Sequence, residues 1–533
     1  MIAIPEHLPE DIEVLKDIIL ELVSSNKSFS NKIEYLEREI RYLQEENKLL
    51  LQKMFGSKRE KITSQEEDIQ PTLFDEVETC KDLEEDAEEE IVVSSHTRKK
   101  RGRRPLPEEL PRVEIIHDIS EEEKRCRCGC ELKRIGEEVS EKLDIIPPKI
   151  QVQRHIRYKY ACKNCEGVES EGGAVKTASL PAQMIPQGIV TPGLLAWVIV
   201  SKFCDGLPFY RQEKLFERIG VELSRSTLSN WSILAYRGCQ RLLGLLKEEL
   251  KSSPLVGMDE TTVQVMKEEN RKDTTKSYMW VFRGGTRGRP VILFRYNPGR
   301  GEDFVLKEFE GYEGIIVTDG YSGYNKLGNK EKVLHAGCWA HVRRKFFEAS
   351  TNGKDNKSFA NTVLSMIKNL YEVESEIREK GYSEVEIQEL RDSRSRPVVM
   401  KIGELLNKHK NNIAPKSLTG KAISYTLGIW PKLLLYLDNG IIPIDNNLVE
   451  NAIRPFVVGR KNWLFSGSPG GADASAGLYS IIETAKGNGL EPYWYMRYLF
   501  EKLPDCQSDD EIYKLLPNKI DPDVISKFRS GVN

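Results

Sequence analysis

The stretch GIIVTDGY at residues 314–321 decides the interpretation of the fold, because it is a short apolar run that ends in a carboxylate, Asp319. Such a run predicts a strand buried on both faces, as in parallel sheets. A second run, PLVGMDE at residues 254–260, ends in Asp259 in the same way. Two further strands are predicted after it, YMWVF at 278–282 and VILF at 291–294. Strands that both end in an acid can bring Asp259 and Asp319 side by side.

A third carboxylate, Glu450, belongs to a segment of helical character, DNNLVENAIRPF at residues 445–456. Asp445 is expected to cap this helix, which would place Glu450 more than one turn inside it and Arg454 on the same face. For any one acid, an ordinary exposed ion pair is the simpler explanation. The order of all three acids along the chain argues for a site.

Three neighbouring carboxylates need a cation, because each negative charge makes the others harder to ionise. Oxygen ligands favour Mg²⁺ or Mn²⁺ over zinc. Two such ions can stabilise both the attacking and the leaving oxygen of a phosphoryl transfer.

The N-terminal segment, residues 1–56, carries a heptad repeat. Counting by sevens from Ile12 gives mainly isoleucine, with Asn26 and Asn47 in the same register, and counting from Leu15 gives leucines and one phenylalanine. This pattern favours a parallel two-stranded coiled coil, in which a buried asparagine fixes the register. The run SSNKS at residues 24–28 is poor in helix formers and could divide the coil in two. The alternative is an amphipathic helix that packs against its own protein.

The formal charge of −3 conceals two segments of opposite sign. Residues 66–90 carry −12, which leaves +9 for the rest of the chain, and residues 57–97 are expected to be a disordered acidic linker. A basic arm follows at residues 98–112, with the cations Arg98, Lys99, Lys100, Arg101, Arg103 and Arg104. Extended arginines of this kind can enter the minor groove of DNA. The alternative is a solvated charge run or phosphate contact without sequence preference.

Five of the ten cysteines form two groups within residues 113–172. The first group is Cys126, Cys128 and Cys130, and the second is Cys162 and Cys165. Two such knuckles, separated by β-like segments such as residues 149–160, predict one structural zinc in a ribbon. The second knuckle has regular spacing, but the first offers three thiolates for two places. Cys128 is expected to be a ligand, with either Cys126 or Cys130 beside it.

Residues 173–250 have a helical pattern. Within them, YRQEKLFERIG at 210–220 precedes LSRSTLSNW at 223–231, which gives a helix, a turn with glycine, a serine cap and a second helix. This spacing is typical of a helix-turn-helix, in which Arg225 would approach DNA. An ordinary helical hairpin is the alternative.

Two segments near the predicted site carry further cations, HAGCWAHVRRK at 335–345 and GRKNW at 459–463. We expect the first to be a helix that faces DNA, with His341 close to the metals, and disfavour a second zinc site there. The residues of this region expected to contact DNA are Arg343, Arg344, Lys345, Arg454, Arg460, Lys461 and Trp463.

These motifs closely resemble those of the insertion sequence 66 family of transposases. The segments that carry the resemblance are DET at 259–261, TDGYSGY at 318–324, NNLVENAIRP at 446–455, GRKNW at 459–463, MFGSK at 54–58 and ETAKGNGL at 483–490, together with the heptads, the basic arm and the cysteines. The resemblance implies an RNase H-like fold and a DDE triad of Asp259, Asp319 and Glu450, which would hold two Mg²⁺ or Mn²⁺ ions. It also implies cleavage at the element's terminal inverted repeats and transfer of the 3′ ends into target DNA. The irregular first cysteine group departs from the family pattern and leaves the zinc ligands open.

The expected architecture is multidomain α+β, with a coiled coil, a zinc ribbon and a helix-turn-helix before an RNase H-like α/β catalytic domain. That domain is expected at residues 251–352 and 441–480, around a helical insertion at 353–440 whose role the sequence does not indicate. A C-terminal helical segment is expected at 481–533.

The sequence therefore predicts a bacterial DNA transposase that acts as a homodimer or larger assembly, with accessory proteins of the same element as conceivable partners. No signal peptide is recognised, and the apolar run at 194–200 is too short to span a membrane. A cytoplasmic protein, at the nucleoid when bound to DNA, is expected. One alternative is an RNase H-like nuclease without strand transfer, which would need the triad but not the coiled coil, basic arm, zinc ribbon and helix-turn-helix. The other is a DNA-binding regulator, from which only the triad distinguishes the enzyme.

Overall fold

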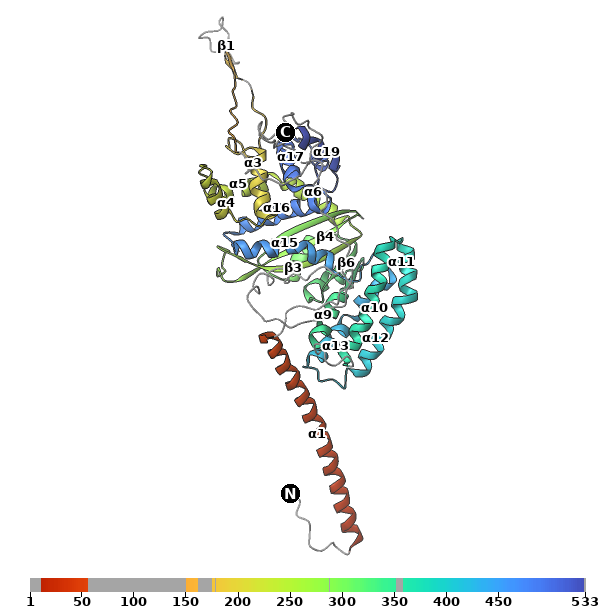
Figure 1. Cartoon of the computed structure of the whole chain (residues 1–533). Helices are drawn as coiled ribbons and strands as arrows, with labels where there is room; N and C mark the ends of the chain where they lie inside the picture. The colour runs from red at the N-terminus through yellow and green to blue at the C-terminus, as the bar shows by residue number, and fades with distance from the viewer. Residues whose placement is uncertain are drawn as a thin grey trace, which may run out of the picture. The chain divides into compact units, whose positions relative to one another are not determined.

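The structure, a computed structural model, describes residues 11–55, 150–161, 175–177, 179–286, 288–350 and 358–531. The chain divides into two units, residues 1–79 with 181–533, and residues 80–180. Its elements are those of a mixed α+β protein, as predicted (Figure 1). No helix of the described part is long and apolar enough to cross a membrane.

A six-stranded mixed sheet is the framework of the larger unit. Its hydrogen-bonded order is β5 (Arg289–Asn297), β4 (Lys276–Thr286), β3 (Leu255–Val265), β6 (Gly314–Thr318) and β7 (Val333–Gly337), with β8 (Phe465–Ser466) paired to the end of β3. β4 runs antiparallel to both β3 and β5, whereas β3, β6 and β7 run parallel to one another. All four apolar runs of the sequence are therefore strands of one sheet. β3 continues to Val265, however, so the expectation that this strand ends at Asp259 is wrong.

Helix α16 (Pro469–Gly487) covers β5, the outer strand of the antiparallel half. The hydroxyls of Ser480 and Thr484 accept from the backbone N–H groups of Phe294 and Ile292, at 2.8 and 3.0 Å. Side chains of the helix thus replace the strand partner that β5 lacks on this side. An edge covered in this way does not offer its backbone to another chain.

The helices that precede the sheet pack into its core. They are α3 (Pro192–Phe203), α4 (Phe209–Arg218), α5 (Arg225–Gly238) and α6 (Gln240–Lys251). At the other end of the chain are α17 (Pro492–Lys502), η3 (Leu503–Asp505), α18 (Asp509–Tyr513) and α19 (Pro522–Gly531). One continuous apolar core includes buried residues of both groups and of β3, β4 and β5.

Short elements precede, connect and follow the parallel strands β6 and β7. They are α7 (Glu302–Glu308) before β6, η1 (Ser322–Tyr324) and α8 (Asn325–Gly328) between β6 and β7, and α9 (Trp339–Ala349) after β7.

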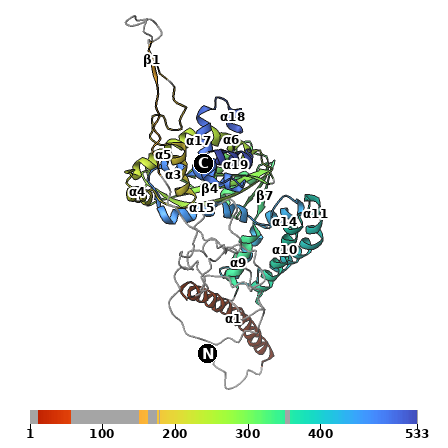
Figure 2. The ribbon, with the colours of Figure 1, turned by 45° about the horizontal axis from the view of Figure 1, so that its top comes forward.

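A group of helices is inserted between α9 and α15 (Asn447–Trp463). They are α10 (Phe359–Lys380), α11 (Glu384–Leu390), the π-helical turn η2 (Arg391–Ser395), α12 (Arg396–His409), α13 (Leu418–Gly428) and α14 (Trp430–Asp438). They share a second apolar core with α9 and with the β6 and β7 side chains Ile315, Val317 and Ala336. Figure 2 shows α10, α11 and α14 grouped beyond β7.

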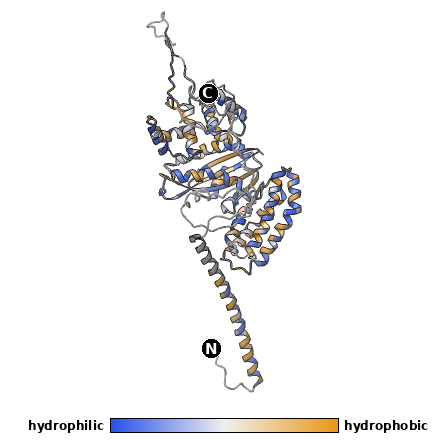
Figure 3. Ribbon diagram, viewed as in Figure 1, coloured by the Kyte–Doolittle hydropathy of each residue, from blue (hydrophilic) through white to orange (hydrophobic). Residues whose placement is uncertain are grey.

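The N-terminal heptads lie on a single helix, α1 (Ile12–Phe55). The run at residues 24–28 continues the helix, so our expectation that it could divide the coil is wrong. The helical residues on both sides outweigh the low helix propensity of this run. Apolar residues recur along α1 (Figure 3), and Ile19, Leu22, Ile33 and Leu36 are about half exposed or more. A helix that exposes its heptad positions has an apolar stripe available for a partner helix.

In the smaller unit, β1 (Lys159–Ala161) pairs with β2 (Val175–Thr177) in an antiparallel ladder. Residues 150–158 have no regular secondary structure, so the predicted β-like segment is a strand only at its end. The five clustered cysteines, the acidic linker and the basic arm lie outside the described residues.

Candidate active site

The two predicted aspartates lie at the same level of the sheet. Parallel strands β3 and β6 pair Gly257 with Val317, and each aspartate follows its strand's paired residue by two positions. Since side chains alternate with a period of two, Asp259 and Asp319 lie on the same side of neighbouring strands. The backbone N–H of Tyr321 donates to Asp319 Oδ1 at 2.8 Å and orients this carboxylate.

The third acid, Glu450, lies in the first turn of α15, which is anchored on β3. The side-chain amide of Asn446 donates to the carbonyl oxygen of Met258 at 2.9 Å. Val449 packs over Gly257, where an added Cβ would lie only 2.3 Å from Val449 Cγ2. The missing side chain at Gly257 therefore lets the start of α15 approach the strand immediately before Asp259.

The predicted cap of this helix requires a correction. The residue at the N-cap is Asn446, whereas Asp445 precedes it and accepts from the backbone N–H of Asn447 at 3.1 Å. Glu450 is consequently in the first turn of α15 and not deeper inside the helix. A carboxylate in this turn benefits from the unpaired N–H groups of the helix end.

The electrostatics of Asp259 reflect how close the three acids are. Burial is the largest cause that raises the pKa of Asp259 well above its usual value, and the negative charges of Glu260, Glu450 and Asp319 raise it further. Without a cation, ionising Asp259 is therefore costly. The donor set consists of carboxylate oxygens, which fits a hard divalent ion such as Mg²⁺ or Mn²⁺.

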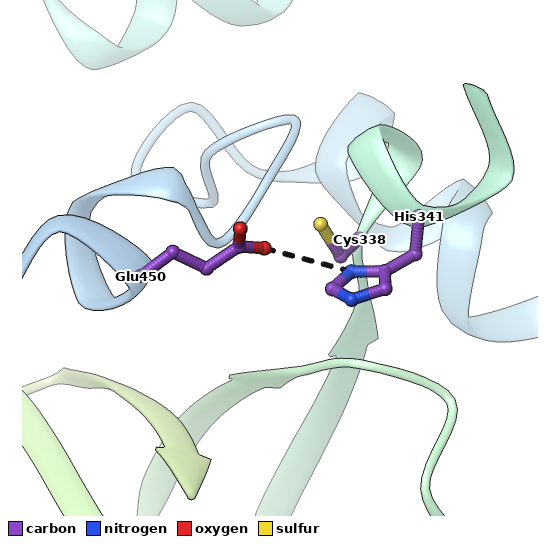
Figure 4. A group of neighbouring side chains, drawn as sticks. All are labelled: Cys338, His341 and Glu450. Carbon is purple, nitrogen blue, oxygen red and sulfur yellow. Dashed lines mark ion pairs between the residues drawn. The ribbon is translucent and has the colours of Figure 1, made fainter. Parts of the chain in front are cut away.

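Glu450 also faces three residues of the segment after β7, and Figure 4 draws two of them, Cys338 and His341, beside it. Arg344 Nη2 lies 3.3 Å from Glu450 Oε2, and His341 Nδ1 lies 3.7 Å from Glu450 Oε1. The sulfur of Cys338 completes a group whose ligand atoms all lie within 4.8 Å of one another. Arg344, predicted to bind phosphate, thus has a carboxylate partner in the structure.

Glu260, next to Asp259, is held by other partners. Its carboxylate accepts from Arg300 Nε at 2.7 Å and also from the Tyr324 hydroxyl. The Arg300 guanidinium stacks 3.7 Å above the Tyr321 ring, and its side chain is 40% exposed. Glu260 is therefore an anchor for Arg300, which presents a partly exposed cation beside the acids.

Other residues predicted to contact DNA lie on several elements. Arg225 is exposed at the start of α5, and its backbone N–H donates to Glu213 Oε1 at 3.0 Å. Lys345 Nζ lies 4.5 Å from the centre of the Tyr425 ring. Arg343 belongs to α9, and Arg454 and Lys461 belong to α15.

Arg460 and Trp463, also predicted to contact DNA, have partners within the protein. Arg460 Nη1 donates to the hydroxyl of Thr261 at 3.2 Å. Trp463 is partly buried, with its ring edge-on to Phe456 at 5.5 Å. The arm residues from Arg98 to Arg104 are outside the described part of the chain.

Sequence reasoning did not single out Arg300 as a site residue, and it named Asn446 only within the family motif. The segment that contains Cys338 was weighed as a second zinc site and disfavoured. Asn446 follows the predicted cap, but its side chain makes no capping bond and instead donates to Met258 of β3, a contact that no local pattern signals. The pairing of Arg300 with Glu260 and the approach of Glu450 to Cys338 and His341 depend on contacts between distant segments, which a single sequence does not show.

Family comparisons cover most of the chain. A family model described as "Transposase IS66 family" matches residues 187–474. Further matches are "zinc-finger binding domain of transposase IS66" at 123–166, "Transposase C of IS166 homeodomain" at 42–115 and "IS66 C-terminal element" at 480–517. The zinc-finger match includes all five clustered cysteines.

Curated relatives occur in Sinorhizobium fredii. The uncharacterized protein y4qI is 33% identical over 97% of this chain and 98% of its own length. The uncharacterized protein y4jD is 33% identical over 77% of this chain and 81% of its own length. The similarity to y4qI thus extends over nearly the whole of both chains.

Proposed function

We propose a function for this chain, which belongs to the IS66 family of transposases. It binds the terminal inverted repeats of its own element, cuts them in a metal-dependent reaction and transfers the 3′ ends into target DNA. The observation that carries the catalytic part is the register of β3 and β6, with Asp259 and Asp319 at one level and Glu450 on a helix anchored to β3. The strand order, with three antiparallel strands followed by two parallel ones, supports an RNase H-like assignment.

In this proposal Asp259, Asp319 and Glu450 hold two divalent ions, Mg²⁺ or Mn²⁺. When bound, such ions polarise the scissile phosphate and stabilise the attacking and leaving oxygens. The protein's own contribution is to fix the three carboxylates on rigid elements, through the Tyr321 N–H for Asp319 and through the Asn446 anchor for Glu450. Arg300, anchored by Glu260, is available to bind a DNA phosphate.

DNA recognition is proposed for the α4–α5 pair as a helix-turn-helix. Ser224 caps α5, and its hydroxyl accepts from the backbone N–H of Thr227 at 3.2 Å. Leu228 and Trp231 are buried, whereas Arg225 and Asn230 are exposed. A capped helix with short polar side chains on its open face suits the major groove. The zinc ribbon and the basic arm would add DNA contacts, and α1 would join two copies through its heptads.

The test is cleavage of a labelled duplex that carries the element's own ends, with Mg²⁺ or Mn²⁺. We expect nicking by the wild type and a loss of at least about 10³-fold in Asp319→Asn, because metal charge stabilisation is worth several kcal/mol and about 1.4 kcal/mol is tenfold in rate. Asp510→Asn is the matched control, since Asp510 is exposed on α18. End binding should be unchanged in both variants.

The outcomes separate the transposase from its two alternatives. Joining of the labelled 3′ ends to a target plasmid supports transposition, whereas nicking without joining supports a nuclease. Undiminished cleavage by Asp319→Asn contradicts the assignment of the carboxylates. Specific end binding without cleavage by the wild type, under any of the metals, favours a DNA-binding regulator.

A further inference from the structure

Cys338, His341 and Glu450, called here the Cys338 cluster, combine three kinds of metal ligand (Figure 4). Cys338 is the N-cap residue of α9, His341 lies in the first turn of that helix, and Glu450 lies in the first turn of α15. One ligand atom from each residue lies within 4.8 Å of the other two. The cluster is thus formed where two helix starts meet.

Two atoms of the cluster are buried and lack a hydrogen-bond partner among the described residues, His341 Nδ1 and Glu450 Oε1. They face each other at 3.7 Å, which is longer than a hydrogen bond. Buried polar atoms are nearly always satisfied in folded proteins, so such a pair calls for an explanation. An ion between the two atoms would satisfy both.

The third donor gives the cluster its chemical preference. The Cys338 side chain is fully buried, and the backbone N–H of Asn446 donates to its sulfur at 3.3 Å. Sulfur, imidazole nitrogen and carboxylate oxygen together suit zinc and other borderline ions, whereas Mg²⁺ prefers oxygen alone. Bonds of about 2.0–2.3 Å to a tetrahedral zinc bring ligand atoms to roughly 3.5 Å apart, so each side chain needs to move by about 1 Å or less.

We propose that the Cys338 cluster is a second metal site, distinct from the cysteine ribbon, which takes zinc or a similar borderline divalent ion. Binding forms bonds from the ion to sulfur, nitrogen and oxygen, and the thiol proton of Cys338 passes to solvent. Water can fill the remaining position. The ion engages Glu450, which the proposed DNA-cutting site also needs.

The functional consequence, which rests on the proposed function, is inhibition. An ion in the Cys338 cluster withdraws Glu450 from the hard-ion site formed with Asp259 and Asp319. Micromolar zinc is then expected to inhibit DNA cleavage even when Mg²⁺ is in large excess. The site would make cleavage responsive to the supply of borderline metal ions.

Metal binding itself is tested without DNA, on the full chain. The protein is first loaded with zinc and then dialysed against a chelator. The chelator strips the Cys338 cluster, whose three protein ligands hold zinc more weakly than the four thiolates expected in the ribbon. The protein is then titrated with Co²⁺. We expect a sulfur-to-cobalt charge-transfer absorption of one thiolate in the wild type, its loss in Cys338→Ser and at least tenfold weaker binding in His341→Gln. Cys239→Ser is the matched control, because Cys239 is another fully buried thiol and should leave the absorption unchanged.

Equilibrium dialysis against zinc supplies an independent count. The wild type should bind one more zinc per chain than Cys338→Ser. An equal count in both proteins, or a cobalt absorption that persists in Cys338→Ser, would overturn the proposal.

The inhibitory part is measured as the zinc concentration that halves cleavage at fixed Mg²⁺, relative to each protein's own zinc-free rate. That concentration should rise at least tenfold in Cys338→Ser. Equal zinc sensitivity in the two proteins contradicts the inhibition, even if the site binds metal. If no variant cleaves DNA, the proposed function fails, and the cobalt and dialysis results still decide whether the site exists.

Discussion

Replacing Gly257 with alanine tests whether the contact between β3 and α15 sets the position of Glu450. The new Cβ would lie 2.3 Å from Val449 Cγ2 and 2.8 Å from Asn446 Oδ1. Ordinary carbon contacts are about 3.5–4.0 Å, so α15 must withdraw from the strand by more than about 1 Å. A misplacement of about 1 Å can reduce a rate by about 10²-fold, and overpacking costs about 1–3 kcal/mol of stability.

The assay is single-turnover cleavage of the element's ends with Mg²⁺, alongside thermal unfolding. Gly257→Ala should cleave about 10²-fold more slowly while still binding the ends. Adding Val449→Ala removes the closest clashing methyl and should restore part of the rate, at least several-fold. Gly244→Ala is the control, because a Cβ there meets nothing within 4 Å. Cleavage by Gly257→Ala within threefold of the wild type, at unchanged melting temperature, would refute the reasoning.

Three further predictions concern charge. The pKa of Asp259 is raised in the fold, so its protonated form stabilises the fold fully below about pH 4, and this stability is lost as the pH rises through the pKa of the folded state. At pH 7.5 without Mg²⁺, Asp259→Asn should therefore melt at a higher temperature than the wild type. Added Mg²⁺ should raise the melting temperature of the variant less than that of the wild type. Arg391→Met should cost about 3–5 kcal/mol in urea unfolding, since it leaves Glu374 buried without its cation. Arg391→Met with Glu374→Leu should recover only part of that loss, because the carbonyl oxygens of Tyr436 and Ile442 still lack their donor. DNA binding should weaken steeply as salt rises, and Arg225→Ala should lower the salt slope by about one if Arg225 contacts a phosphate.

The parts of the fold that were predictable are those fixed by local sequence. The runs that end in Asp259 and Asp319 are strands of one sheet, because apolar segments of this length must be buried on both faces. The helix of Glu450 was also predictable, but its cap was not. Asp445 and Asn446 are both good capping residues, and the choice between them is made by tertiary bonds to Met258 and Cys338.

Other features depend on contacts that no local pattern encodes. Cys338 and Glu450 are more than a hundred residues apart in the chain and meet only because α14 and the following loop return to the end of β7. The partnership of Arg300 with Glu260 likewise joins the segment after β5 to the middle of β3. The uninterrupted helix through residues 24–28 reflects cooperativity, since extending a formed helix is much easier than starting a new one.

The helical insertion, whose role the sequence did not indicate, holds the segment that leads into α15. Arg391 Nη1 donates to the carbonyl oxygens of Tyr436 and Ile442, at 2.8 and 2.9 Å, while Glu374 neutralises its charge. The Tyr371 hydroxyl donates to Asp445 at 3.0 Å, close to the first turn that contains Glu450.

A chain that must bring its third acid back to the sheet over more than a hundred residues has a large conformational entropy to overcome. Buried hydrogen bonds from side chains to backbone carbonyls fix the segment between α14 and α15, and they hold it more strongly than surface contacts would. The insertion therefore acts on Glu450 through the backbone between α14 and α15, and loosening it should impair cleavage before it impairs binding of the ends.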